Sequence, residues 1–311
     1  MRNLTALTFH YETQPLPTWI GWWLHQLPGW FHRLSCALMF AVELGGPFLL
    51  FGPRWLRHPA ALVQIGLQAL IALSGNYTFF NLLTALLCLP FLDDGWWQRW
   101  LRMKQAESAA APCERRSGGH GPPLQQTALV AVSAVLFTLS LLVTLPSVFT
   151  GVRWPEWYGA VIRTVSATRS VNSYGLFRVM TQTRPEIVIE GSDDGREWKA
   201  YGFKWKPGDP ARRPAFVAPH QPRLDWQLWF AALAHPRREP WAHNLCIHLL
   251  NGTPEVLRLV GDNPFPQRPP RFVRAVLYEY RFTTPAEKAR SGYWWHREPV
   301  DYYFPPLSHR R

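Results

Sequence analysis

One carboxylate lies inside an apolar run near the start of the chain. Glu43 is the single charged residue of the segment 34–52. A charge at the centre of a bilayer costs about 2.5–3.5 kcal/mol on insertion scales, so an intramembrane carboxylate is a candidate functional group. Together with His10, Glu12 or His32 it could relay protons or activate a substrate. The alternative is a neutral or paired carboxyl that locks helices together.

The other reactive residue types form no catalytic or metal-binding signature. The sequence has no Gly-x-Ser-x-Gly motif and no cofactor fingerprint. His243 and His248 are five residues apart and are expected to face differently on a helix. The four cysteines suggest no disulfide framework. We therefore expect no metal, no cofactor and a protein that is not an enzyme.

The elements that must position these residues begin with helices that cross a membrane. About 20 apolar residues span a bilayer. The predicted spans are 34–52, 60–74, 77–92 and 127–149. Residues 93–126 are a polar linker, and 1–150 is the predicted membrane domain.

The second and third spans are separated by Gly75 and Asn76 and read as a tight helical hairpin. Gln64 and Gln68 fall on one helix face, and Asn81 lies on a polar stripe of the next span. Such stripes usually mark contacts between membrane helices. The hairpin and Glu43 are thus expected to need neighbours, either upstream helices or another subunit.

Basic residues give the chain a net charge of +12. They are scattered, and no nucleic-acid motif is present, so an anionic lipid surface is the expected partner and nucleic acid is not. Seven Lys and Arg residues flank the spans on one side and five on the other. By the positive-inside rule, the C-terminal half then lies outside the cytoplasm.

An aromatic cluster precedes the first span. Its residues are Trp19, Trp22, Trp23, Trp30 and Phe31. Amphipathic rings of this kind favour the headgroup level of a bilayer, so an interfacial belt is the preferred interpretation over a functional groove.

The C-terminal half, 151–311, is predicted to be a soluble α+β domain with an antiparallel sheet. Alternating patterns predict strands at 186–190, 196–206, 271–283 and 293–300, with a turn at 192–195. Helices are predicted at 225–234 and 241–250, and a third is capped by Thr253 and ended by Gly261.

Several stretches together resemble the lipase maturation factor family. In the first half they are 7–15, containing His10, Tyr11 and Glu12, then 43–48 and 74–76. In the second half they are 206–210, 212–214, 223–226, 229–232 and 263–265. The order of these motifs covers nearly the whole chain.

The resemblance implies a membrane protein that assists an exported client, with a lipase as the expected client. The residues expected to contact the client are the charged and aromatic side chains of the strongest motifs: Arg212, Arg213, Arg223, Asp225, Trp226 and Trp229. An equally good interpretation has Arg223 and Asp225 pairing to fix a loop before a helix.

The chain departs from the family pattern in two ways. The resemblance implies further membrane helices before His10, whereas Met1 is nine residues upstream, so a shortened chain is expected. Animal members carry cysteines where Trp205 and Ala215 stand here, which points to a bacterial relative. The expected location is the inner membrane with a periplasmic domain in a bacterium, or the endoplasmic reticulum membrane with a lumenal domain in a eukaryote.

Overall fold

The computed structural model describes residues 3–100, 123–149, 151–168, 171 and 180–309. The chain divides into two compact units, of which the first joins Met1–Arg102 to Met180–Arg311 and the second is Met103–Val179. The N-terminal helices and the C-terminal domain therefore belong to one unit, although 77 residues of sequence separate them.

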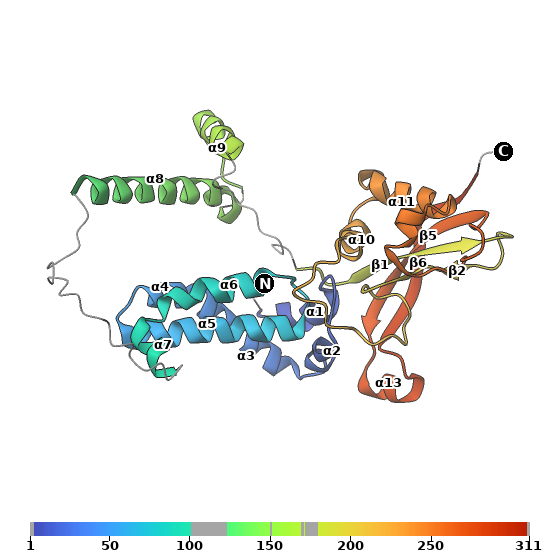
Figure 1. Ribbon diagram of the computed structural model, residues 1–311, viewed down its shortest axis with the longest axis horizontal. Coiled ribbons are helices and arrows are strands. Elements are labelled where there is room, and N and C mark those ends of the chain that lie inside the picture. The colour runs from blue at the N-terminus through green and yellow to red at the C-terminus, as the bar shows by residue number, and fades with distance from the viewer. Residues whose placement is uncertain (1–2, 101–122, 150, 169–170, 172–179, 310–311) are drawn as a thin grey trace, which may run out of the picture. The chain divides into compact units, whose positions relative to one another are not determined.

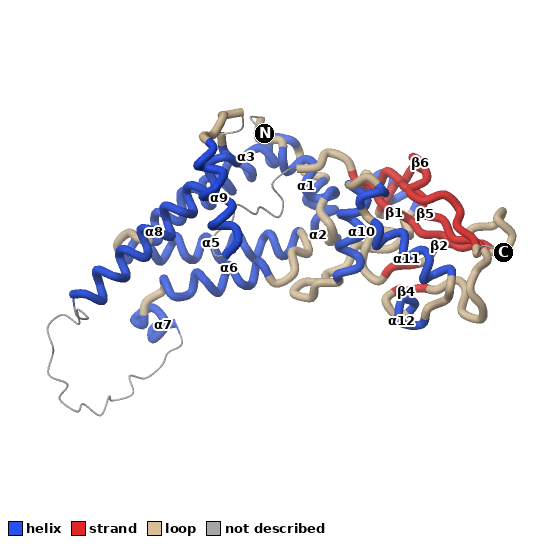
Figure 2. The backbone as a smooth tube through the Cα atoms, turned by 90° about the horizontal axis from the view of Figure 1, so that it is seen from above, coloured by secondary structure: helices blue, strands red, loops and turns tan. Residues whose placement is uncertain are grey.

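Helices make up the described part of the first hundred residues (Figures 1 and 2). They are α1 (Ala6–Thr13), α2 (Trp19–His25), α3 (Gly29–Phe40), the π-helical turn η1 (Ala41–Gly45), α4 (Gly46–Leu50), α5 (Arg54–Ser74), α6 (Phe80–Cys88), the 3-10 turn η2 (Leu89–Phe91) and α7 (Asp94–Trp100).

Within the described ranges, α5 alone is long and apolar enough to cross a membrane. Phe80–Phe91 and Val130–Pro146 are apolar but shorter. The expected span 34–52 is not one α-helix, because η1 interrupts it between α3 and α4. The helix expected at 60–74 begins earlier, at Arg54. The first turn of α5 contains Arg54, whose Nε lies 2.8 Å from the Asp93 carboxylate.

Side-chain amides tie the apolar helices together, as the polar stripes predict. Gln64 Nε2 donates to the carbonyl of Val42 at 2.9 Å, which joins α5 to η1. Asn81 Nδ2 donates to Gln68 Oε1 at 2.8 Å, which joins α6 to α5. The outer faces of α5 and α6 expose leucines, among them Leu70 and Leu87 at 65% and 64%. Amides that face inward and leucines that face outward are the arrangement of helices in lipid.

The C-terminal domain is built on a four-stranded antiparallel sheet in the order β2-β1-β5-β6. Its strands are β1 (Arg184–Ser192), β2 (Lys199–Ala200), β5 (Phe272–Phe282) and β6 (Trp295–Ser308). Two helices cover one face (Figure 1), α10 (Arg223–Leu233) and α11 (Pro240–Leu250). Ile187 and Ile189 from the sheet pack there against Leu228 and Leu249. This confirms the predicted α+β domain.

The expected strand 196–206 is wrong beyond Ala200. Tyr201 N still donates to the carbonyl of Ile189, but β3 (Gly202–Phe203) leaves the sheet and pairs with β4 (Val260–Asp262). Glycines permit this second pairing. A Cβ on Gly202 would lie 2.8 Å from Asp262 Cβ, and one on Gly261 would lie 3.2 Å from the backbone of Lys204.

The same pairing corrects the third predicted helix. Helix α12 (Pro254–Leu257) ends four residues before Gly261, which lies in β4 and ends no helix. Thr253 does not cap it, and its hydroxyl instead contacts the His248 ring at 3.1 Å. Sequence patterns also missed α13 (Pro285–Ser291), although Thr284 and Glu287 form a capping box there.

The second unit contributes α8 (Pro123–Val148) and α9 (Glu156–Thr168). Helix α8 contains the predicted span 127–149 except its last residue. Most of the predicted linker 93–126 lies outside the described residues.

Replacing Asn81 with Ala should weaken the α5–α6 contact, because Gln68 then loses its partner inside an apolar helix pair. The expected cost is about 1 kcal/mol, typical of such bonds in membranes. It can be measured as a lower thermal midpoint of the full chain in nanodiscs. Thr84→Ala is the matched control, since its hydroxyl bonds only Phe80 of its own helix. Equal midpoints for both variants would contradict the role of Asn81.

Candidate functional site

The N-terminal helices and the C-terminal domain meet in one extensive contact, which we call the joint. Its helical side is the segment 10–26 with the turn 74–77. Its other side is Arg184, the loop 206–218, the residues Tyr280, Phe282 and Thr283 at the end of β5, and residues 294–295. Gln14 Nε2 donates to the carbonyl of Ser74 at 2.8 Å, so the two pieces of the helical side hold each other. A Cβ on Gly75 would overlap Gln14, which explains why glycine stands there.

Arg184, at the first residue of β1, is the centre of the joint. Its side chain is fully buried. Its guanidinium donates to the backbone carbonyls of Glu12 at 2.5 Å, of Gln14, and of Pro15 at 3.0 Å. The Glu12 carbonyl belongs to the last turn of α1 and the other two follow the helix, where no further turn receives these oxygens. One side chain therefore satisfies a buried strip of backbone from a segment 170 residues away in sequence.

Two further charges complete a buried ionic cluster. Glu186 Oε1 accepts from Arg184 at 2.6 Å, and its other oxygen lies 2.9 Å from Lys206 Nζ. Lys206 also donates to the carbonyls of Ile187 and Pro207, at 3.0 and 2.9 Å. Burial lowers the pKa of Arg184, and the neighbouring Glu186 carboxylate acts in the opposite direction. Arg184 Nε alone of the guanidinium nitrogens has no hydrogen-bond partner among the described residues. The loss of one member of such a buried cluster leaves an unpaired buried charge.

Asn76 forms a second fastening. Its amide nitrogen donates to the carbonyls of Leu16 and Ala215, at 3.0 and 2.9 Å. Its oxygen accepts from the backbone of Val217 and Ala218, at 2.7 and 3.1 Å. All four partners of a buried asparagine are thus supplied. The expectation that this turn needs upstream helices is wrong for Asn76, whose partners come from the C-terminal domain and from Leu16.

Aromatic packing fills the rest of the joint. Tyr11 and Trp22 from the N-terminal segment pack with Tyr280, Phe282 and Trp295 from the sheet. Trp22 is 1% exposed and meets the Trp294 ring at 5.4 Å. The interpretation of Trp22 as part of a lipid belt is therefore wrong. Trp23 and Trp30 are 55% and 65% exposed and remain available to a membrane surface.

The titratable groups of the N-terminal motif find their partners within the joint. Glu12 Oε2 accepts from the backbone of Phe282 at 3.0 Å, and burial raises its pKa. His25 Nε2 lies 3.6 Å from the same carboxylate, and burial lowers the pKa of His25 to about 4. His10 stacks on Tyr77 with ring centroids 6.0 Å apart. His10, Tyr11 and Glu12 thus have structural roles in the joint.

The proton relay proposed for Glu43 is not assembled. Glu43 lies exposed on η1, and no hydrogen bond or ion pair joins it to His10, Glu12 or His32 in the described part of the chain. His10 and Glu12 are already engaged in the joint. The geometry gives no support to a catalytic role for these residues.

The six residues expected to contact a client divide into three buried residues on α10 and three exposed arginines. Asp225, Trp226 and Trp229 are buried on α10. Asp225 Oδ1 accepts from the backbone of Trp205 and Lys206, at 2.9 and 2.8 Å, and Trp229 Nε1 donates to the carbonyl of Thr13 at 3.1 Å. Arg223 is exposed, and the described structure contains no ion pair between it and Asp225. The interpretation that these two pair is wrong.

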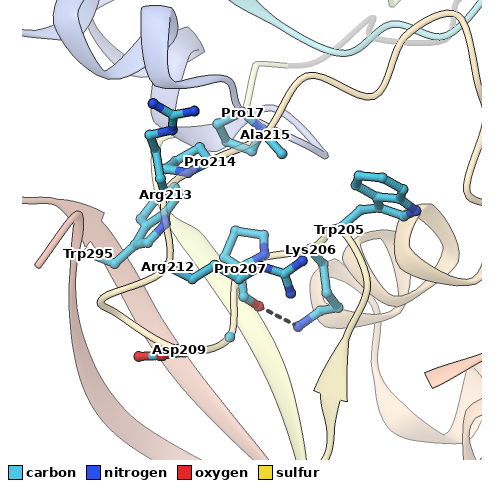
Figure 3. Close-up of a pocket in the computed structure, with 11 residues that line it drawn as sticks. Pro17, Trp205, Lys206, Pro207, Asp209, Arg212, Arg213, Pro214, Ala215 and Trp295 are labelled. Atoms are coloured by element: carbon cyan, nitrogen blue, oxygen red, sulfur yellow. Dashed lines mark hydrogen bonds between the residues drawn. The ribbon is translucent and has the colours of Figure 1, made fainter. Parts of the chain in front are cut away.

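Arg212 and Arg213 line a small recess at the edge of the joint (Figure 3). Arg212 donates to the carbonyls of Phe203, at 2.6 Å, and Lys204. Arg213 lies over the Trp19 ring at 5.7 Å. The recess has room for about 10 Å³, which is the space of a single water molecule. Trp205 and Ala215, where the resemblance implies cysteines in animal members, line this same recess.

Sequence reasoning missed the residues that carry the joint. Lys206 and Asn76 belong to motifs that the family resemblance singles out, and Glu186 was assigned only as a strand end. Arg184 falls in no such motif. An isolated charge two residues before an apolar strand was the available signal, but nothing local indicates that its partners are the carbonyls of Glu12, Gln14 and Pro15.

Comparison with known proteins places both halves of the chain in one family. Residues 1–99 match the lipase maturation factor transmembrane domain, and residues 170–305 match the lipase maturation factor C-terminal domain. No solved structure matches.

Several curated relatives match nearly the full chain. Lipase maturation factor 2 of Mus musculus is 35% identical over 98% of this chain, and that of Gallus gallus is 36% identical over 98%. Lipase maturation factor 1 of Homo sapiens is 35% identical over 99%. The chain spans 56% of the length of each of these relatives. None of these names denotes a catalytic activity, in agreement with the expectation that the chain is not an enzyme.

Arg184→Met should loosen the joint, because Glu186 loses a partner and the carbonyls of Glu12, Gln14 and Pro15 lose their donor. Breaking a buried cluster typically costs about 3–5 kcal/mol. We expect a lower thermal midpoint and faster tryptic cleavage between the helices and the domain. Arg281→Met is the control, because its partner Glu287 is on the surface and such pairs contribute about 0–1 kcal/mol. Similar cleavage rates in both variants would count against the central role of Arg184.

Acidification should also weaken the joint through His25. Its folded pKa of about 4 lies below the ordinary value of 6.5, so the folded state binds this proton less readily than the unfolded state. The resulting stability is present above pH 6.5 and is lost as the pH falls towards 4. His25→Gln should make the thermal midpoint depend less on pH in this window. His220→Gln, at an exposed position, should leave that pH dependence unchanged. Glu12 acts in the opposite direction but is common to both variants. An unchanged slope in His25→Gln would refute the assignment.

Proposed function

Because the chain belongs to the lipase maturation factor family, we propose that it is a membrane-anchored maturation factor that assists the folding or assembly of an exported lipase. The client is met by the C-terminal domain, and the helices anchor that domain and set its orientation. Its chemistry is that of a chaperone, which binds and releases polypeptide without altering covalent bonds.

The joint is the observation that carries this proposal. A maturation factor that acts at a membrane must hold its binding surface at a defined place relative to the bilayer. The buried Arg184 cluster and the four hydrogen bonds of Asn76 fix the C-terminal domain directly to the end of the helices. Because Asn76 lies between α5 and α6, the domain stays next to the membrane surface.

The proposed membrane arrangement keeps a membrane domain of about four spans in 1–150 and a non-cytoplasmic domain in 151–311. Two observations support this orientation. The basic residues favour the opposite ends of the spans, in the loop at 54–57 and the linker after 93. In the structure, Arg54 and Asp93 pair at one end of the α5–α6 hairpin, and the C-terminal domain packs at the Gly75–Asn76 end. The location is then the endoplasmic reticulum membrane in a eukaryote, or the inner membrane in a bacterium.

Among the expected contact residues, the exposed arginines are the ones that remain available to a client. Arg212, Arg213 and Arg223 are exposed, whereas Asp225, Trp226 and Trp229 are buried and support the surface from below. Membrane lipids are further partners, through the exposed rings of Trp23 and Trp30.

The proposal is tested by expressing the chain with a secreted lipase in cells that lack a maturation factor. The measurement is lipase activity per mass of secreted lipase. We expect the wild-type chain and Arg281→Met to raise this specific activity several-fold, and Arg184→Met to lose most of the gain at equal membrane abundance. If the wild-type chain gives no gain with any lipase of a varied panel, the proposed function is wrong. Protease protection of a C-terminal tag reports orientation, and cleavage from the cytoplasmic side would overturn it.

A further inference from the structure

Helix α2 packs against the C-terminal end of α5 and is fixed there by two contacts. The Thr18 hydroxyl, which caps α2, donates to the carbonyl of Leu73 at 2.8 Å. A Cβ on Gly21 would lie 2.6 Å from the carbonyl oxygen of Ser74, so the two helices approach closely at this glycine. In the proposed membrane arrangement α5 ends at the non-cytoplasmic surface. Helix α2 then lies at the level of the lipid headgroups.

The segment 18–32 has the rings of an interfacial helix but none of its cations. It contains Trp19, Trp22, Trp23 and Trp30, and no Lys or Arg. Helices that lie in the headgroup layer usually combine aromatic residues with Lys and Arg, because the cations are attracted to anionic lipid. Cations that complete such a surface must come from another part of the chain.

Helix α13 of the C-terminal domain places a cation beside α2 (Figure 1). Gln26 Nε2, at the end of α2, donates to the carbonyl of Thr283 at 3.3 Å, just before α13 begins. Lys288 Nζ lies 4.0 Å from the centre of the Trp294 ring and 6.0 Å from that of the Trp22 ring. The ammonium of α13 therefore lies over rings that the joint packs together.

The cations of α13 have no carboxylate partners in the described part of the chain. Residues 281–294 contain three cations and one acid, so their net charge is +2. The acid, Glu287, accepts two hydrogen bonds from Arg281, at 2.9 and 2.8 Å. Arg290 is exposed, and its Nε donates only to the carbonyl of Ala286 in its own helix. Lys288 and Arg290 are thus available to an anion outside the chain.

Exposed rings lie close to these cations. Tyr293, which follows α13, is 48% exposed, and Trp23 of α2 is 55% exposed. A second loop of the C-terminal domain reaches the same end of α5. Phe216 is 42% exposed, the backbone on both sides of it bonds to the Asn76 side chain, and its ring meets that of Trp19 at 5.9 Å. Exposed aromatic rings beside unpaired cations are the composition of a surface that enters the headgroup layer.

We propose that α2 and α13 together form a binding surface for anionic phospholipid headgroups, where Lys288 and Arg290 meet the phosphates and Trp23 and Tyr293 enter the layer beneath them. The inference rests on the proposed function, because it takes the end of α5 to be the non-cytoplasmic membrane surface. It goes beyond the lipid contact of Trp23 and Trp30, since the charge comes from the C-terminal domain. Anionic lipid then holds both sides of the joint at one membrane surface.

Chemical labelling of Lys288 tests this surface on the full chain. The chain is reconstituted in nanodiscs of POPC alone and of a POPC and POPG mixture, and is labelled with uncharged N-acetoxysuccinimide. Mass spectrometry measures the acetylation rate of each lysine. We expect Lys288 to react about fivefold more slowly in the POPG discs, because an anionic surface binds each nearby cation by about that factor. Lys199, exposed in the edge strand β2, should react equally in both.

Added salt should remove the difference at Lys288, because it screens the attraction to the lipid. Equal rates at Lys288 in the two kinds of disc would overturn the proposal. Slow labelling in both would also contradict it, because the surface would then be covered by something other than anionic lipid, such as a second copy of the chain. This comparison needs no variant to fold.

A matched pair of variants locates the contact. Arg290→Glu reverses a charge of α13 and should reduce the difference at Lys288 to less than about twofold. Arg196→Glu makes the same change in net charge at an exposed position before β2, and should keep the full difference. Equal effects of the two variants, at equal thermal midpoints, would assign the lipid dependence to the net charge of the chain and refute the surface.

The lipase experiment separates this inference from the proposed function. If the wild-type chain raises lipase activity but Lys288 is labelled equally in both kinds of disc, the maturation role stands and the lipid surface is wrong. If POPG protects Lys288 but no lipase gains activity, the lipid surface stands and the maturation role fails. Protection by POPG together with a gain in lipase activity supports both.

Discussion

Arg184 makes the interaction on which the rest of the first unit depends. Its guanidinium satisfies three carbonyls of the N-terminal segment and one carboxylate of its own strand, all in a fully buried place. Removing a guanidinium from water is costly, and Arg184 Nε finds no hydrogen-bond partner among the described residues. The price is met here by backbone that would otherwise be buried without partners. The cluster therefore contributes more to specificity than to stability, because its groups find their partners in only one arrangement of the two chain segments.

The Arg184 cluster shows how the C-terminal domain is held against the N-terminal helices. A soluble domain that follows membrane helices is often tethered through a flexible linker and samples many orientations. In this chain the contact is made instead by α1, α2 and the turn at Asn76, which meet the domain directly. The helices and the domain form one compact unit.

The C-terminal domain has two recesses, which differ in place and size. The first, beside Arg212 and Arg213, belongs to the edge of the joint and holds no more than a water molecule. The second, beside Phe265, is larger and lies outside the joint. The motifs shared with the family thus serve two purposes, since some build the joint and others shape a surface.

The sequence by itself determined the helical character of the first half, the α+β class of the C-terminal domain and the family, because apolar runs, alternating strands and turn residues are local signals. It placed β1, β5, α10 and α11 within a few residues. It could not determine that 196–206 divides between two sheets, because Gly202 and Gly261 reveal their role only when their strands meet. Nor could it assign Arg184, Asn76 or Trp22, whose partners lie between about 60 and 270 residues away in the chain. Local pattern specifies which elements form, whereas a buried charge is explained only by the distant groups that tertiary packing brings to it.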